Sequence, residues 1–165
     1  MKMNDQKKLQ GVTLFSVLLI VYSLWQLALI LDFPRYKYIF QFLPDTSLLI
    51  RFSGSITLRI LTIILAAGIL SYKNRFRKAL IFLSIYNILT VYWKHPYEAF
   101  VNWDRYYQIS PEKINTLIYR ILGNMAIDYQ TIKIISVAAA CISDVLFYGA
   151  IIYYFTRPPV KQRFT

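Results

Sequence analysis

Two charged residues, Arg59 and Asp144, lie inside long apolar stretches of the sequence. An ionised side chain within a bilayer costs at least about 2.5–3.5 kcal/mol, so such residues usually mark a functional site or a structural pair. A rise of about 1.5 Å per residue along a helix puts both residues near the bilayer midplane, within about one helical turn of each other in depth. Their opposite charges predict a buried ion pair between them.

Four further polar residues reach similar depths in the other two apolar stretches. They are Ser23 and Gln26 in the first stretch, and Asn87 and Thr90 in the third. Polar side chains often hydrogen-bond across neighbouring membrane helices, so a structural layer that holds the bundle in register is the first interpretation. A small water-filled cavity or substrate site is the second interpretation, and a path for protons or ions is the third.

One cluster resembles catalytic machinery, with His95 three residues before Glu98. Pro96 separates the two, and the surrounding aromatic residues are typical of a membrane interface, so an interfacial histidine is favoured over a general base. One histidine and one cysteine, Cys141, cannot form a metal site from these ligands, an internal disulfide or a redox pair. The sequence also lacks the common hydrolase and nucleotide-binding motifs. We therefore expect no cofactor and no enzymatic activity.

Four apolar stretches must position these residues. They cover residues 12–31, 53–72, 79–93 and 134–155. A helix of about 20 apolar residues crosses a hydrocarbon core of about 30 Å. The third stretch is short, but Lys78 and Lys94 at its ends can extend their charged groups to the interfaces. The sequence thus predicts an all-α membrane protein, a bundle of four transmembrane helices in one domain.

The connection between the third and fourth stretches contains a helix start at Ser110-Pro111-Glu112, where serine caps the helix and proline occupies its first turn. Apolar residues then recur at helical spacing. They are Ile114, Leu117, Ile118, Ile121, Leu122 and Met125. This segment is too short and too charged to span a bilayer. We expect an amphipathic helix over about 111–122 that lies in the outer interface.

The basic residues predict an orientation. The chain has 19 Lys and Arg against 8 Asp and Glu, and ten of the basic residues lie in three short segments: 2–8, 73–78 and 157–163. Under the positive-inside rule these segments face the cytoplasm, so both termini are inside and two long aromatic connections are outside. The net charge of +11 then reflects topology and attraction to anionic lipid rather than nucleic-acid binding.

The composition is 57% hydrophobic and 16% charged, with a mean hydropathy of +0.43, which excludes a disordered chain and most water-soluble folds. We expect a non-catalytic accessory, assembly or lipid-associated subunit, with a membrane-protein partner or a second copy of itself. A small transporter or channel that uses Arg59 and Asp144 is the alternative. A membrane-embedded enzyme with a site at the outer interface is the second alternative. A bacterial inner membrane is favoured because the chain is compact, cysteine-poor and without an evident organelle address.

Overall fold

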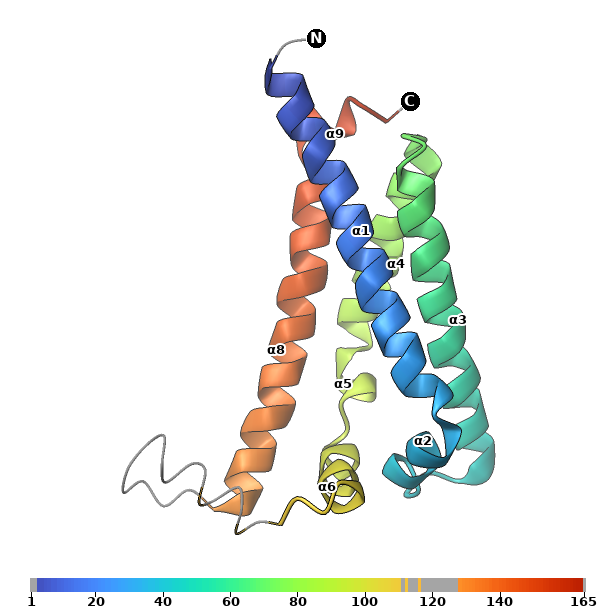
Figure 1. The fold of residues 1–165 in the computed structure, drawn as a ribbon, viewed down its shortest axis with the longest axis vertical. Helices are drawn as coiled ribbons and strands as arrows, with labels where there is room; N and C mark the ends of the chain where they lie inside the picture. Colours follow the sequence, from blue (N-terminus) through green and yellow to red (C-terminus); the bar gives the residue numbers. More distant parts are fainter. Residues whose placement is uncertain (1–2, 111, 113–115, 117–127, 165) are drawn as a thin grey trace.

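The computed structural model describes residues 3–110, 112, 116 and 128–164, and this part of the chain is helical without a β-strand (Figure 1). Three helices are long and apolar enough to cross a membrane. They are α1 (Met3–Leu31), of which Gly11–Leu31 is the apolar part, α3 (Asp45–Ile69) and α8 (Tyr129–Thr156). Their length and composition are consistent with an integral membrane protein.

The third predicted span, residues 79–93, is divided between two helices. α4 (Asn74–Leu89) has Thr90 as its C-cap, and the Thr90 hydroxyl donates to the carbonyl of Tyr86 at 2.8 Å. A separate turn of helix, α5 (Val91–Lys94), follows. The 16 residues of α4 span only about 24 Å, less than the apolar thickness of a bilayer. The sequence-based prediction of one helix over 79–93 was therefore wrong at this break.

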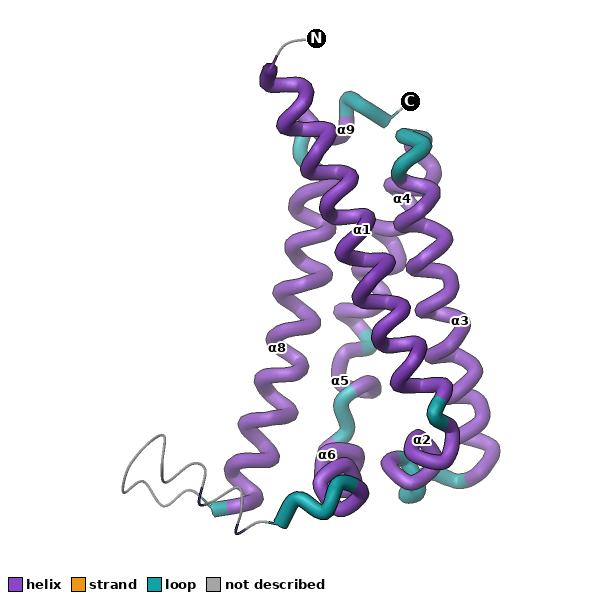
Figure 2. The backbone as a smooth tube through the Cα atoms, in the orientation of Figure 1, coloured by secondary structure: helices purple, strands orange, loops and turns teal. Residues whose placement is uncertain are grey.

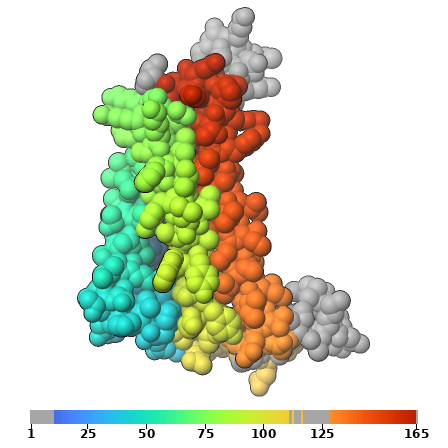
Figure 3. All heavy atoms as spheres, turned by 180° about the vertical axis from the view of Figure 1, so that it is seen from behind, coloured from blue at the N-terminus to red at the C-terminus, as the bar shows by residue number. Residues whose placement is uncertain are grey.

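The long helices α1, α3, α4 and α8 extend along the long axis of the molecule (Figure 2). α1 packs against α3, α3 against α4, and α4 against α8. On the back of the molecule α4 fills the space between α3 and α8 (Figure 3). Both termini and α9 (Pro158–Lys161) lie at one end, and α2 (Phe33–Ile39) and α6 (Tyr97–Tyr106) lie at the other.

The buried apolar core lies in the half of the bundle next to the termini. Its members come from all four long helices and include Val12, Leu65, Leu80, Ile151 and Phe155. The opposite half of the bundle, next to the short helices α2 and α6, holds most of the buried charged residues. The two halves therefore differ in character: one is a packed core and the other contains a polar site.

The outward faces of the long helices carry large apolar side chains. Trp25 is 63% exposed, Leu146 is 68% exposed and Leu89 is 76% exposed. Apolar surface of this extent is unfavourable in water and matches the hydrocarbon of a bilayer. The amphipathic helix expected over 111–122 lies outside the described residues.

The short helices α2 and α6 form the end of the bundle opposite the termini. The Asp32 carboxylate caps α2 by accepting from the backbone N–H of Arg35 at 3.4 Å, and Pro34 lies in the first turn. The side-chain amide of Asn102 on α6 donates to the carbonyl of Ile39 at 3.0 Å. Both helices were missed in the sequence, where these segments were treated as aromatic connections.

A buried charge pair joins α6 to α8. Asp104 and Lys133 are each 5% exposed and form an ion pair, and the Tyr129 hydroxyl donates to the same carboxylate at 2.8 Å. Because both charges are removed from solvent, each depends on the other for compensation. This contact holds the start of α8 against the end of the bundle.

We predict that Asp104→Ala lowers the free energy of unfolding by about 3–5 kcal/mol, because it leaves the Lys133 ammonium buried without its partner. The double variant Asp104→Leu/Lys133→Met should cost less than Asp104→Ala alone. Thermal and denaturant unfolding in detergent measure both effects. If the losses in the single variants Asp104→Leu and Lys133→Met add up to the loss in the double variant, the pairing is contradicted.

Candidate functional site

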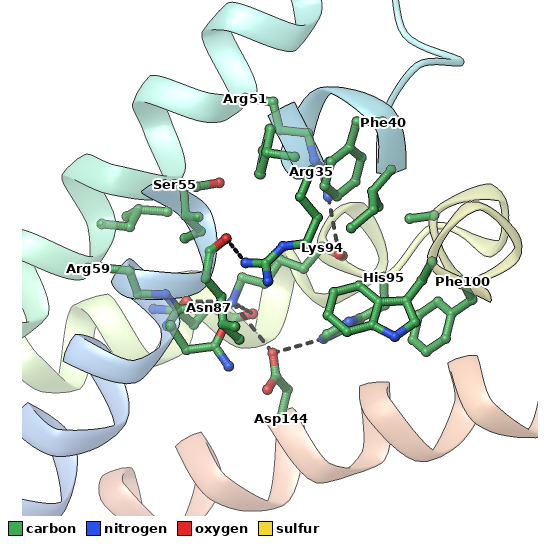
Figure 4. Close-up of a pocket in the computed structure, with 18 of the residues that line it drawn as sticks. Arg35, Phe40, Arg51, Ser55, Arg59, Asn87, Lys94, His95, Phe100 and Asp144 are labelled. Atoms are coloured by element: carbon green, nitrogen blue, oxygen red, sulfur yellow. Dashed lines mark hydrogen bonds and ion pairs between the residues drawn. The ribbon is translucent and has the colours of Figure 1, made fainter. Parts of the chain in front are cut away.

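A cavity of about 460 Å³ lies between α1, α3 and α8, in the half of the molecule that contains α2, α5 and α6 (Figure 4). Its polar lining is mainly cationic. Its cationic residues are Arg35, Arg51, Arg59 and Lys94, and His95 and the carboxylate of Asp144 line it as well. The rest of the wall is largely apolar and aromatic. A cavity with such a lining suits a ligand that combines negative charge with an apolar part.

Three residues of α3 form a stripe that lines the cavity: Arg51, Ser55 and Arg59. Their spacing of four residues puts them on one helix face, with about 12 Å of rise between the two arginines. The stripe therefore provides a series of hydrogen-bond donors along one wall.

Each guanidinium of this stripe is held by a neutral group. Arg51 Nη2 donates to the backbone carbonyl of Lys94 at 3.1 Å, and its guanidinium lies 4.3 Å from the centre of the Phe40 ring. Arg59 Nη1 donates to the Tyr148 hydroxyl at 3.1 Å. Neither guanidinium forms an ion pair with a carboxylate in the part of the chain that the structure describes. Both positive charges therefore line the cavity without a direct carboxylate partner among the described residues.

Lys94 is the last residue of α5, the short helix that follows the break at the end of α4. Its ammonium donates to the backbone carbonyl of Asn87 at 3.1 Å and to the Asn87 side-chain oxygen. It also lies 3.9 Å from Asp144 Oδ2 and 5.0 Å from the centre of the Tyr148 ring. A cation near the C-terminal carbonyls of a helix is favourable because it offsets the negative end of the helix dipole. Lys94 thus stabilises the end of α4 and joins it to α8.

His95 and Asp144 are in direct contact, with His95 Nε2 3.2 Å from Asp144 Oδ2 (Figure 4). The His95 side chain is 25% exposed and the Asp144 side chain is 11% exposed. When Nε2 carries the proton and donates a hydrogen bond to Asp144, the lone pair of the ring lies on Nδ1. Nδ1 has no hydrogen-bond partner among the described residues. The arrangement is an oriented imidazole in the wall of a basic cavity.

The ion pair predicted between Arg59 and Asp144 is not formed. Both residues line the same cavity, so the depths read from the sequence bring them to one site. Asp144 instead pairs with Lys94 and His95, and Arg59 contacts Tyr148, one helical turn beyond Asp144 on α8. The break after Leu89 accounts for the difference, because it brings residues expected at the membrane edge into the cavity.

The other predicted site residues separate into two groups. Gln26 and Asn87 line the cavity. Ser23 is buried in α1 and its hydroxyl has no partner among the residues described, while Thr90 bonds within its own turn. Glu98 is exposed in the first turn of α6 and does not line the cavity. His95 therefore belongs to the site without the glutamate that the sequence associated with it.

Two basic residues of the site, Arg35 and Arg51, were missed because both lie outside the four predicted apolar stretches. Arg35 donates to the carbonyl of Leu29 and to the Tyr107 hydroxyl at 3.2 Å, and its Nε lies 3.6 Å from Asp32. α3 begins at Asp45, eight residues before the predicted boundary at 53, so Arg51 lies inside a helix. The four-residue spacing between Arg51, Ser55 and Arg59 is a signal that could have found it.

Comparisons with protein-family models, with curated proteins and with solved structures found no match to this chain. The apolar helices and the basic cavity between them are therefore the features that bear on function.

We predict that the free energies of unfolding of variants at Asp144 and Lys94 are strongly non-additive, because these side chains are in contact. Coupling of about 0.5–3 kcal/mol is expected for this pair and for Asp144 with His95. The coupling between Asp144 and Arg59 should be smaller. Double-mutant cycles with Asp144→Asn, Lys94→Met, His95→Gln and Arg59→Gln measure each value. The geometry would be contradicted if Arg59 and Asp144 showed the largest coupling.

Proposed function

We propose that this protein is a membrane-embedded binding protein for an anionic, lipid-like molecule with a phosphate headgroup. The observation that carries the proposal is the pair of arginines, Arg51 and Arg59, that face an apolar-walled cavity without a carboxylate partner among the described residues. This is the lipid-associated form of the function expected from the sequence.

The charge balance of the cavity supports an anionic ligand. The charge of Lys94 is compensated by Asp144, and the charge of Arg35 is compensated by Asp32. The positive charges of Arg51 and Arg59 remain without a carboxylate partner among the described residues. A phosphomonoester carries about −1.5 to −2 charges near neutral pH and matches this excess. Guanidinium groups bind phosphate oxygens through paired hydrogen bonds, and these bonds are stronger where water is excluded.

The apolar lining supports a ligand with a hydrocarbon part. Six apolar side chains from α1, α2, α3 and α6 contribute to the walls: Leu29, Ile30, Ile39, Leu58, Phe100 and Trp103. A small inorganic anion would leave this surface uncovered, whereas an alkyl or prenyl chain would cover it. A headgroup on the α3 stripe with its chain against these side chains satisfies both kinds of lining.

The membrane arrangement that we propose has four crossings, with α4 and α5 together making the third. Both termini then face the cytoplasm, α2 and α6 lie at the outer surface, and a helix over 111–122 lies in the outer interface. The location of both termini at the end opposite α2 and α6 supports an even number of crossings (Figure 1). We retain a bacterial inner membrane, anionic lipid at the cytoplasmic face, and a membrane-protein partner or second copy as parts of this proposal.

The binding proposal predicts that the purified protein in detergent binds phosphatidate more tightly than phosphatidylcholine. Arg51→Gln and Arg59→Gln should each weaken phosphatidate binding about ten- to hundredfold, because each removes charge-assisted hydrogen bonds to the headgroup. Arg75→Gln is the matched control, since Arg75 is exposed in the first turn of α4 at the other end of the molecule. Titration calorimetry and native mass spectrometry measure the affinities.

Equal loss of binding in Arg75→Gln and in the two cavity variants would contradict a site in the cavity. Equal affinity of the unaltered protein for phosphatidate and phosphatidylcholine would contradict recognition of the headgroup charge.

The proposed orientation predicts the labelling of introduced cysteines in a Cys141→Ser background. Arg105→Cys in α6 should react with a membrane-impermeant maleimide on intact cells, because Arg105 is exposed at the proposed outer end. Lys73→Cys, in the exposed turn before α4, should react only after the cells are permeabilised. The reverse pattern would invert the orientation, and reaction of both sites on intact cells would contradict the even number of crossings.

A further inference from the structure

We propose that the cavity is catalytic, with the imidazole of His95 as the nucleophile that removes the phosphoryl group from a lipid-like phosphomonoester. This inference rests on the proposed function, because the substrate is the ligand assigned to the cavity. It goes beyond binding in assigning a reaction, a nucleophile and a product.

The first support is the orientation of the ring by Asp144. The contact of 3.2 Å between His95 Nε2 and Asp144 Oδ2 favours the tautomer with its proton on Nε2. The Nδ1 lone pair is then available, and the carboxylate stabilises the positive charge that the ring gains when Nδ1 forms a bond. Asp144 acts through the ring and is a positioning residue.

The second support is the location of the two unpaired arginines relative to this pair. Arg51 donates to the carbonyl of Lys94, which is the carbonyl of the peptide bond to His95. Arg59 donates to Tyr148, which lies one helical turn after Asp144. A phosphate bound by both guanidinium groups is therefore held beside the imidazole, and its negative charge is neutralised as the transition state develops.

The third support is the free ring nitrogen itself. The contact with Asp144, and the Lys94 ammonium 3.9 Å from the same carboxylate oxygen, lie on the Nε2 side of the ring. No hydroxyl is hydrogen-bonded to His95 Nδ1 among the described residues. The imidazole nitrogen Nδ1 is therefore assigned as the attacking group.

The reaction balances in two steps. His95 Nδ1 attacks phosphorus, the bond from phosphorus to the alcohol oxygen breaks, and the leaving oxygen takes a proton from a water molecule. A second water molecule then attacks the phosphorus of the phosphohistidine, gives a proton to the hydroxide left by the first, and the phosphorus–nitrogen bond breaks. The products are a lipid-like alcohol and inorganic phosphate, and neither an oxidant nor a reductant is required.

The test uses the full chain in detergent micelles with phosphatidate and with a prenyl monophosphate as probes. Release of inorganic phosphate is expected from the unaltered protein, and His95→Gln should lower the rate at least about a thousandfold while phosphatidate remains bound. Glu98→Gln is the matched control, because this exposed carboxylate lies outside the cavity, and its rate should equal that of the unaltered protein.

A trapping experiment tests the intermediate without any variant. Acid-labile and alkali-stable phosphate on the protein after rapid quenching is the behaviour expected of a phosphohistidine, and His95 is the sole histidine of the sequence. Peptide mapping should locate the label at His95.

Asp144→Asn should lower kcat with little change in KM, and Asp144→Glu should restore part of kcat, which a purely structural role for the carboxylate would not produce.

The outcomes separate this inference from the proposed function. If the protein binds both probes but releases no phosphate and carries no phosphohistidine, catalysis is overturned and binding stands. If neither probe binds to the cavity, both proposals are overturned. Phosphate release that persists at the full rate in His95→Gln overturns the assignment of the nucleophile.

Discussion

The polar half of the molecule depends on the contacts of the Lys94 ammonium. It joins the carbonyl end of α4, at Asn87, to the carboxylate of Asp144 on α8. A break in a helix exposes backbone carbonyls, and in an apolar environment these require a partner. By supplying that partner, Lys94 allows the chain to leave the helix at Thr90 and directs His95 into the space between α3 and α8.

The contact between Lys94 and Asp144 lies where the character of the bundle changes. On one side of it the long helices form a packed core, and on the other side they surround an open site. Near the termini the four long helices pack through side chains such as Leu65, Leu80 and Ile151. Beyond the break, α5 and α6 replace the continuous helix and leave a cavity of about 460 Å³. Lys94 and Asp144 compensate each other there, so the positive charge that remains belongs to Arg51 and Arg59. The same break therefore creates the space and determines which charges are free to meet a ligand.

Hydropathy predicted the three long apolar helices, and helix rise predicted that Arg59 and Asp144 reach the same site. It did not predict the partners of Asp144, since residues 79–93 contain no proline or charge that signals the break after Leu89. The early start of α3 was also missed, which left Arg51 outside the predicted apolar stretch. The short helix α2 did carry a signal in the sequence, with Asp32 as its cap and Pro34 in its first turn. The pairing of side chains depends on where a helix ends and on its rotation about its own axis. Neither property follows from the length of an apolar stretch.

We infer that the arginine stripe of α3 receives an anionic headgroup inside the bundle. An experimental structure of the protein in nanodiscs that contain phosphatidate would test this binding site. We expect density for a phosphate group within hydrogen-bond distance of the Arg51 and Arg59 guanidinium groups, near Ser55, with its acyl chain along the apolar wall that includes Leu58. Headgroup density confined to the basic segment 73–78 at the other end of the molecule, with no lipid in the cavity, would contradict it.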